Sequence, residues 1–144
     1  MLTYLLINSG SRFDEINNGK FKAMDDGFVE LSNISKTRDK KRKIKKELLD
    51  LNPSKFMDIL TRYRALQKPQ ESAIVQLNEY LKKEYNFTSY NLRKYYANVS
   101  FHLLEDKNIT QNAYLSNVLG HDNDETARCY SSFRVISDEA PTFR

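Results

Sequence analysis

Apolar residues recur every three or four positions through most of this chain, which is the pattern of helices with one buried face. Gly10 follows the first apolar run and Gly120 follows the last clear one, and glycine is the residue that most often ends a helix. Prolines and threonines stand where further helices are expected to start. The predicted helices cover residues 1–8 and 12–17 and begin at Pro53, Pro69, Thr88 or Ser89, Thr110 and residues 122–124.

One stretch alternates instead. In residues 27–35, Val29 and Leu31 share one face of an extended chain, and the residues between them are polar, as in a half-buried strand. The turn signal Asp-Asp-Gly leads into this stretch, and residues 41–49 supply a returning strand. The pattern therefore predicts a mainly α domain with one small antiparallel sheet, whose hairpin turns near residues 37–40.

Basic residues gather in the predicted hairpin. Residues 36–46 hold eight Lys or Arg and one Asp, a charge of +7, so the rest of the chain carries 4 − 7 = −3. A local basic strip on a nearly neutral body is typical of a surface that binds a polyanion such as nucleic acid. A lysine-rich loop that only faces solvent, and a basic module that binds RNA or a membrane surface, remain open as alternatives.

The composition narrows the class of protein further. The 144 residues, of which 40% are hydrophobic, fit one folded domain with a core of its own. No apolar run approaches the roughly 20 residues that span a bilayer, so we expect no membrane association. The single cysteine, Cys129, excludes an intramolecular disulfide and, with only two histidines, argues against a zinc site. We therefore expect an intracellular protein with no bound metal.

Helical packing leaves a set of polar residues unexplained, and together they fit chemistry at a phosphodiester. The guanidiniums of Arg12 and Arg93 are able to hold the oxygens of one phosphate, and His121 is able to donate a further hydrogen bond. A hydroxyl such as that of Tyr130 attacks the phosphorus, and a lysine such as Lys36 protonates the departing oxygen. Taken singly, each residue also has a plain structural explanation, as a surface arginine, a helix-end histidine or a packed tyrosine.

Four motifs in sequence order resemble those of the tyrosine recombinases, the phage integrase family. LLINSGSRFDEI resembles the first arginine box, of pattern L-L-x-T-G-x-R-x-x-E, and SKT resembles the hairpin lysine. SYNLRKYYANVSF resembles the second arginine box, H-x-L-R. LSNVLGHDNDETARCYSSF resembles the closing L-L-G-H box and the T-x-x-Y of the nucleophile helix. The matches run from Leu5 to Phe133 and therefore cover nearly the whole chain.

This resemblance implies a mainly α fold with a small three-stranded antiparallel sheet, and a site that cleaves DNA without metal, ATP or another cofactor. Arg12 and Arg93 would clamp the scissile phosphate, with His121 hydrogen-bonded to it. Lys36 would protonate the 5′-oxygen, and Tyr130 would form a 3′-phosphotyrosine bond that conserves the energy for rejoining. The residues expected to contact DNA along the hairpin are Lys36, Arg38, Lys40, Lys41, Arg42 and Lys43.

Position 90 departs from the family pattern. The family usually has a histidine three residues before its second arginine, whereas this chain has Tyr90 before Arg93. The resemblance includes branches with Tyr or Lys there, among them telomere resolvases and some viral and archaeal integrases. Because a tyrosine ordinarily has a pKa of about 10, it is a poor general base at neutral pH. We therefore expect Tyr90 to donate a hydrogen bond to the phosphate or to Tyr130, and a packed aromatic residue is the alternative.

Two catalytic functions fit these residues. The first is a site-specific recombinase or integrase of a virus or mobile element, and the second is a telomere resolvase that makes hairpin DNA ends by the same chemistry. A third function, a DNA-binding protein that keeps the fold without catalysis, stays open. We expect double-stranded DNA as the partner, with self-association into a dimer or tetramer on it. Residues 1–144 would be a single catalytic domain, the C-terminal fragment of a longer recombinase without its N-terminal clamp domain.

Overall fold

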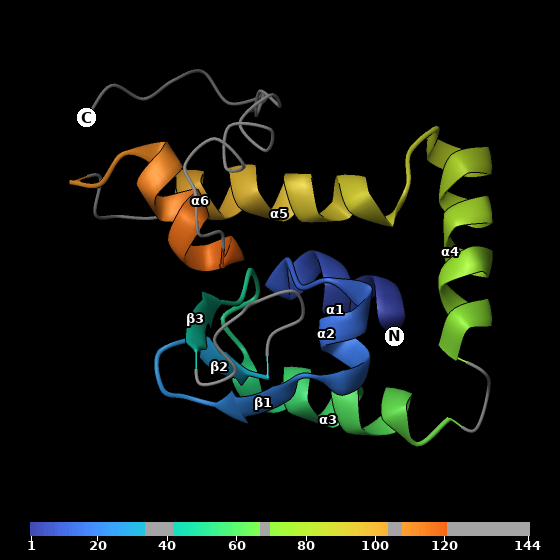
Figure 1. Ribbon diagram of the computed structural model, residues 1–144, viewed down its shortest axis with the longest axis horizontal. Coiled ribbons are helices and arrows are strands. Elements are labelled where there is room, and N and C mark those ends of the chain that lie inside the picture. The colour runs from blue at the N-terminus through green and yellow to red at the C-terminus, as the bar shows by residue number, and fades with distance from the viewer. Residues whose placement is uncertain (34–41, 67–69, 104–107, 121–144) are drawn as a thin grey trace.

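The structure, a computed structural model, describes residues 1–33, 42–66, 70–103 and 108–120. Its elements, in chain order, are α1 (Leu2–Ser9), α2 (Phe13–Asn18), β1 (Lys20–Ala23), β2 (Phe28–Ser32), β3 (Lys43–Glu47), α3 (Pro53–Arg64), α4 (Gln70–Tyr85), α5 (Ser89–Leu103) and α6 (Gln111–Leu119). The described chain is therefore mainly helical with one three-stranded antiparallel sheet, as predicted. Figure 1 shows the long helix α5 along one side of the molecule and the sheet with α3 on the other, with α1, α2 and α6 in between.

The helix boundaries follow local signals in the sequence. Pro53 is the first residue of α3, where no N–H is needed, and the side chain of Asn52 accepts a hydrogen bond from a backbone N–H of the first turn. Thr110 caps α6 in the same manner. Gly10 and Gly120 end α1 and α6 in the left-handed conformation. These predicted starts and stops are confirmed.

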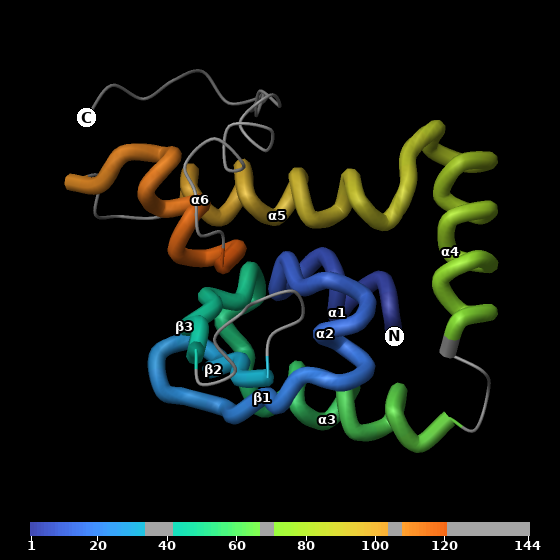
Figure 2. Tube along the Cα trace, viewed as in Figure 1, coloured from blue at the N-terminus to red at the C-terminus, as the bar shows by residue number. Residues whose placement is uncertain are grey.

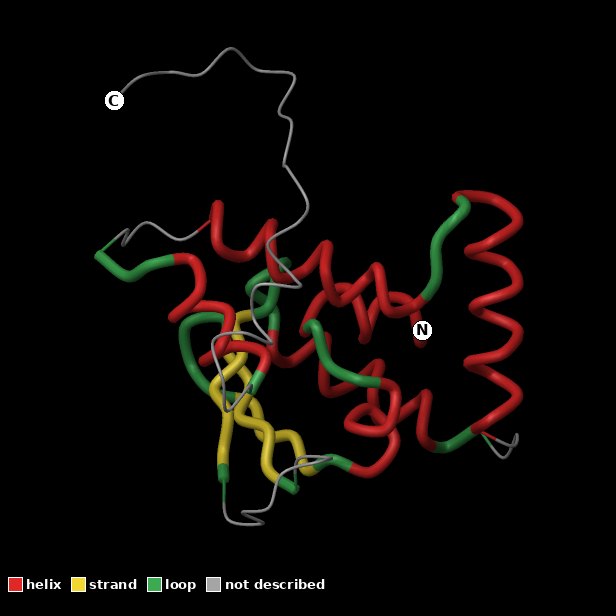
Figure 3. The backbone as a smooth tube through the Cα atoms, turned by 45° about the horizontal axis from the view of Figure 1, so that its top comes forward, coloured by secondary structure: helices red, strands yellow, loops and turns green. Residues whose placement is uncertain are grey.

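The sheet has the strand order β1-β2-β3, and Figure 3 shows its strands together beside the helices. Val29 and Leu31 of β2 are fully buried, and Leu31 lies opposite the buried Ile44 of β3. The predicted alternation is therefore confirmed. The edge strand β1 was implied by the resemblance and not by the residue pattern, because its side chains are mostly exposed and carry no apolar alternation.

Two apolar clusters hold the helices together. The first joins the five helices α1 to α5 and the sheet, and includes Leu5, Ile16, Val29, Phe56 and Leu81. The second joins α5 to α6 around Tyr96, Leu115 and Leu119. The helix α5 takes part in both clusters, so residues on its buried sides lie where the first and last described helices approach each other.

Two aromatic residues at the helical spacing of apolar positions, Tyr80 and Tyr95, would be expected in the core, but both are exposed. Tyr80 is 53% exposed and Tyr95 is 50% exposed. Figure 2 shows α4 at the outer end of α5, so only one side of α4 faces the rest of the molecule. On α5, consecutive residues point about 100° apart, so the fully buried Tyr96 enters the core and its neighbour Tyr95 does not. Within the described ranges, no helix has the length and apolar character needed to cross a membrane.

Candidate active site

The turn between α1 and α2 depends on Gly10. Its φ of 59° strains any residue that has a Cβ, and a Cβ there would lie 2.1 Å from a ring carbon of Tyr96. The tight turn leaves Arg12 as the N-cap residue of α2, directly after the buried Ser11. The backbone of Arg12 is therefore held between a closely packed turn and a helix.

Glu15 holds the side chain of Arg12 from the first turn of α2. Its carboxylate accepts hydrogen bonds from the Arg12 backbone N–H at 2.8 Å and from Arg12 Nη1 at 2.9 Å. The side chain of Glu15 is 1% exposed, whereas that of Arg12 is 27% exposed. One edge of the Arg12 guanidinium is thus fixed by a buried carboxylate, and part of the group remains accessible to solvent.

Arg93 reaches the same region from α5 and is almost fully buried. Its Nη1 donates a hydrogen bond to the carbonyl of Gly10, and its Nη2 donates one to the carbonyl of Leu119 at 2.7 Å. Nη1 also lies 4.0 Å from a carboxylate oxygen of Glu15. A guanidinium is a rigid plane of donors, so contacts to the ends of α1 and α6 fix the orientation of the whole group.

Arg12, Tyr90 and Arg93 line one pocket of about 150 Å³, whose other walls are Leu6, Ser11, Phe13 and Ser89. The structure therefore brings together the three predicted catalytic residues that it describes. Tyr90 is 51% exposed, and Nζ of Lys94 lies 5.2 Å from the centre of its ring. An aromatic residue this exposed is not a core residue, which argues against packing as the role of Tyr90.

Of the remaining predicted site residues, the structure describes only two, Arg42 and Lys43. The others lie outside the described residues: Lys36, Arg38, Lys40, Lys41, His121 and Tyr130. Arg42 directly precedes β3 and is half-buried, and Lys43, the first residue of β3, is exposed. Lys43 forms an ion pair with Glu30 at 2.9 Å.

The end of α6 is defined by Gly120, the residue before His121. Gly120 has a φ of 69°, and its N–H bonds to the carbonyl of Ser116. A Cβ at this position would lie 2.1 Å from Cδ1 of Ile44. The last turn of α6 therefore packs directly on β3, and a larger residue at position 120 would force the two apart.

Lys46 does not belong to the solvent-facing basic strip, where it was predicted, because it is 0% exposed. The strand β3 alternates, so Lys46 shares its inner face with Ile44. Its Nζ donates a hydrogen bond to the carbonyl of Val118 at 3.0 Å, and Glu15 is its counter-charge. Ile44 and Lys46 lie two positions apart in the sequence, as residues on one face of a strand do. Because most of the neighbouring residues are also lysines, this spacing did not indicate that Lys46 is buried. Glu15 was likewise present in the first arginine box without a role assigned to it.

Arg12, Glu15, Lys46 and Arg93 form a charge cluster, buried except for part of Arg12, that shifts the pKa values of Lys46 and Glu15. Burial lowers the pKa of Lys46 to about 7, while Glu15 opposes this shift and Arg93 and Arg12 add to it. Burial alone would raise the pKa of Glu15, but Lys46, Arg93 and Arg12 hold it below its ordinary value. With Lys46 protonated, the cluster carries 3 − 1 = +2. Such an excess of fixed positive charge is able to stabilise a phosphate oxyanion.

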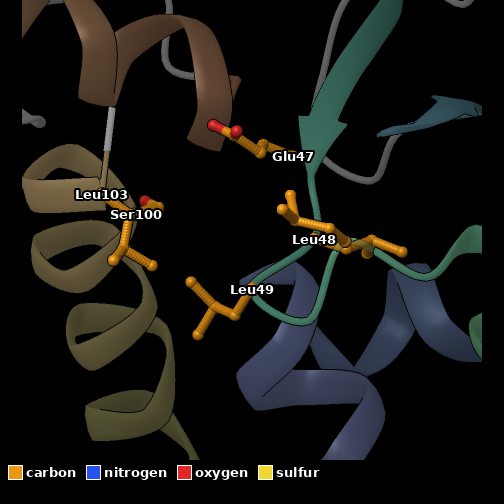
Figure 4. Close-up of a pocket in the computed structure, with 6 residues that line it drawn as sticks. Glu47, Leu48, Leu49, Ser100 and Leu103 are labelled. Carbon is orange, nitrogen blue, oxygen red and sulfur yellow. The ribbon is translucent and has the colours of Figure 1, made fainter. Parts of the chain in front are cut away.

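A second pocket lies between the end of β3 and α5, and Figure 4 shows residues from both elements around it. Its lining residues are Glu47, Leu48, Leu49, Leu51, Ser100 and Leu103. Burial raises the pKa of Glu47, and Lys45 opposes the shift. A carboxyl group among leucines does not suit a phosphate, so this pocket is not a candidate for it. Among the side chains that the structure describes, no three His, Cys, Asp or Glu are grouped as a metal site requires.

Comparison with known families identifies the domain. The family model of the telomere resolvase ResT/TelK catalytic domain matches residues 32–133, which are 102 of the 144 residues. This chain belongs to the telomere resolvase family. The match includes the positions of Tyr90, Arg93, His121 and Tyr130, whereas Arg12 precedes it. A comparison with curated protein sequences found no significant match.

Solved structures of telomere resolvases, also named protelomerases, share the fold. Protelomerase TelK complexed with substrate DNA is 20% identical, with a TM-score of 0.74 over 99% of this chain and 33% of that one. Protelomerase tela covalently complexed with substrate DNA is 17% identical, with a TM-score of 0.69 over 91% of this chain and 51% of that one. A mutant of the latter complexed with DNA hairpin product has a TM-score of 0.67 at 16% identity. This telomere resolvase chain thus spans 33% of the length of the first protein and 51% of the length of the second.

The resemblance to tyrosine recombinases and the predicted fold class are confirmed, because telomere resolvase catalytic domains are tyrosine-recombinase-like. Of the two catalytic functions that the sequence predicted, membership of the telomere resolvase family favours the resolvase over the integrase.

Proposed function

We propose that this telomere resolvase domain cleaves double-stranded DNA and rejoins the strands into hairpin ends. The observation that carries the proposal is the meeting of Arg12, Tyr90 and Arg93 at one pocket, in a chain of the telomere resolvase family. The structural relatives complexed with substrate DNA and with a DNA hairpin product support the choice of substrate.

In the proposed reaction, the hydroxyl of Tyr130 gives up its proton to solvent water and its oxygen forms a bond to the phosphorus as the bond from phosphorus to the 5′-oxygen breaks. Lys36 gives a proton to that departing oxygen. The pentavalent transition state concentrates negative charge on the non-bridging oxygens, where fixed cations stabilise it without reorganising. Arg12 and Arg93 suit this task because Glu15 and the carbonyl of Leu119 already hold their guanidiniums in place.

Tyr90 takes the place of the histidine that precedes the second arginine in other recombinases. It lies on the wall of the arginine pocket, on the same helix as Arg93 and one turn before it. A phenol keeps its proton at neutral pH, so Tyr90 acts as a hydrogen-bond donor to the phosphate and not as a base. His121, directly after Gly120, supplies a further donor.

The phosphotyrosine ester conserves the energy of the cleaved bond, so rejoining needs neither ATP nor a metal. Attack by the 5′-hydroxyl of the complementary strand closes a hairpin, whereas attack by a strand of another duplex gives recombination. A palindromic site presents two equivalent phosphates for cleavage. We therefore expect two copies of the chain to act together on one site.

The test uses the full-length protein and a pool of palindromic duplexes with randomised half-sites. DNA that becomes covalently attached is recovered after denaturation of the protein, and its sequence gives the target site. Uncut copies of that site are then incubated with the protein, and products that renature at once after melting are scored as hairpins. We expect hairpin ends, with attachment through Tyr130.

The matched control is Tyr130→Phe, which differs by one oxygen atom. It is expected to bind the selected site and to form no covalent adduct. Adducts that persist in Tyr130→Phe would show that another residue is the nucleophile. Strand exchange between two different duplexes, without hairpin products, would replace the resolvase function with that of an integrase.

A further inference from the structure

Lys46 and Glu15 take no direct part in the steps above, yet they are among the largest fully buried side chains of the described residues. A buried ammonium group loses its hydration, and it is stable only where specific contacts offset that loss. The inner face of β3 places Lys46 where its neighbour Ile44 packs on α6. An apolar residue would fill this place without the cost of burying a charge, so the presence of a lysine needs an explanation.

Two cations hold the last carbonyl groups of α6. Lys46 Nζ donates to the carbonyl of Val118 at 3.0 Å, and Arg93 Nη2 donates to that of Leu119 at 2.7 Å. The final carbonyl groups of a helix lack partners inside the helix and carry partial negative charge, so a cation is well suited to each. Gly120 follows these two residues, and His121 is the next residue of the chain.

Glu15 connects this pair of contacts to Arg12. Its two carboxylate oxygens bond to the backbone and side chain of Arg12, and one of them lies 4.0 Å from Nη1 of Arg93. Its charge also attracts Lys46. A displacement of Lys46 would therefore disturb both the end of α6 and the Glu15 carboxylate that orients Arg12.

We propose that Lys46 is a positioning residue for strand cleavage. It holds the end of α6, and with it the point from which His121 follows, in a fixed relation to Arg12 and Arg93. The inference rests on the proposed function, because His121 contacts a phosphate only in that function. Because Lys46 is fully buried, its effect passes through the α6 carbonyl and Glu15 and not through direct contact with the DNA.

The protonation of Lys46 makes this role dependent on pH. Within the described part of the chain, the groups that face it are Glu15 of α2, Arg12 at the N-cap of α2, Arg93 of α5 and the carbonyl of Val118 in α6. An ammonium group interacts with a carbonyl and a carboxylate more strongly than a neutral amine does. Because burial lowers the pKa of Lys46 to about 7, its contribution to cleavage should be largest in mildly acidic solution and should decline above neutral pH.

The experiment compares the full-length wild type with Lys46→Met, which keeps an unbranched side chain of similar volume, one atom shorter, and removes its charge. The rate of covalent attachment is measured at saturating concentrations of the selected palindromic duplex, over the pH range in which circular dichroism shows both proteins folded. We expect Lys46→Met to bind the duplex within about threefold of the wild type and to form the adduct at least about tenfold more slowly at pH 6. The ratio of the two rates should fall as the pH is raised to about 9.

Lys22→Met is the matched control, because Lys22 is exposed on β1 of the same sheet; it should leave the rate unchanged. Glu15→Gln is the second variant. Without the charge of Glu15, Lys46 loses its proton at lower pH, so the decline in rate should move to lower pH even if Lys46→Met fails to fold. Equal rates for wild type and Lys46→Met, or a ratio independent of pH, would overturn the role of Lys46. If the wild type forms no adduct through Tyr130, the proposed function itself fails.

Discussion

Replacement of Lys46 by methionine is expected to change how the stability of the domain depends on pH. In the folded chain the pKa of Lys46 is about 7, against an ordinary value of 10.5 in the unfolded chain. Between these values the unfolded chain binds a proton that the folded chain does not, so the free energy of unfolding rises with pH. The slope is at most about 1.4 kcal/mol per pH unit, so the wild type should gain about 2 kcal/mol between pH 7.5 and pH 9.

Among the residues that the structure describes, the other buried groups do not produce the same trend in this range. Burial raises the pKa of Tyr114 to about 12 and that of Tyr96 well above its ordinary value. Folded tyrosines that keep their protons lower the stability only as the pH rises above about 10. The lowered pKa of Glu15 adds stability that is lost only in acid. The interval between pH 7.5 and pH 9 therefore reports chiefly on Lys46.

The assay is urea unfolding of the domain followed by circular dichroism at about pH 7.5 and pH 9. Lys46→Met should show little change in stability between the two, and Lys22→Met, at an exposed position of the same sheet, should keep the slope of the wild type. At pH 7.5 we expect Lys46→Met to be folded, because an apolar residue of similar volume often replaces a buried charge without loss of stability. A wild type whose stability does not change with pH, or a Lys46→Met variant with the wild-type slope, would refute a buried lysine of lowered pKa.

Three further predictions concern the arginine pocket and the hairpin. Tyr90→Phe should slow covalent attachment to DNA about tenfold in a single-turnover assay, because it loses a hydrogen-bond donor. Tyr95→Phe, at an equally exposed position of α5, should not. If Tyr90→Phe and the wild type react at equal rates, Tyr90 does not belong to the site. Gly10→Ala should lower the free energy of unfolding by at least about 2 kcal/mol, because the new Cβ strains a left-handed backbone and clashes with Tyr96 of α5. Denaturation at constant pH measures this loss, and a smaller loss would mean that the turn relaxes. The double variant Arg42→Ala with Lys43→Ala removes two basic residues next to the start of β3. In salt titrations, it should reduce the slope of the logarithm of the DNA-binding constant against the logarithm of salt concentration by up to about 2. An unchanged slope would mean that neither residue contacts a phosphate.

The parts of the fold that the sequence predicted are those set by neighbouring residues. Pro53, Thr110 and Gly120 mark helix ends because caps and left-handed stops act within a few positions of the chain. β1 could not be found from its own residues, because Lys20–Ala23 is short and mostly exposed. Its presence follows from pairing with β2, which is a contact between separate parts of the chain.

The candidate site divides in a similar way. The order of the motifs was enough to predict Arg12, Tyr90 and Arg93, and the structure places the three at one pocket. Lys46 could not be recognised from the sequence, because its partner Val118 lies on a distant helix and a lysine among lysines looks solvent-exposed. Tertiary packing decided its burial, and only the packed structure shows that a residue of the basic strip belongs to the buried charge cluster.

Covalent attachment of Tyr130 to DNA is the step on which the proposed telomere resolution rests, and peptide mapping of the adduct tests it most directly. The full-length protein is trapped on the selected palindromic duplex, digested, and analysed by mass spectrometry for the modified peptide. We predict one modified residue, Tyr130, joined to a 3′-phosphate of the DNA. When the reaction is allowed to continue without trapping the covalent adduct, we predict hairpin ends. Attachment at another residue, or no attachment by a folded protein that binds the duplex, would contradict the proposal.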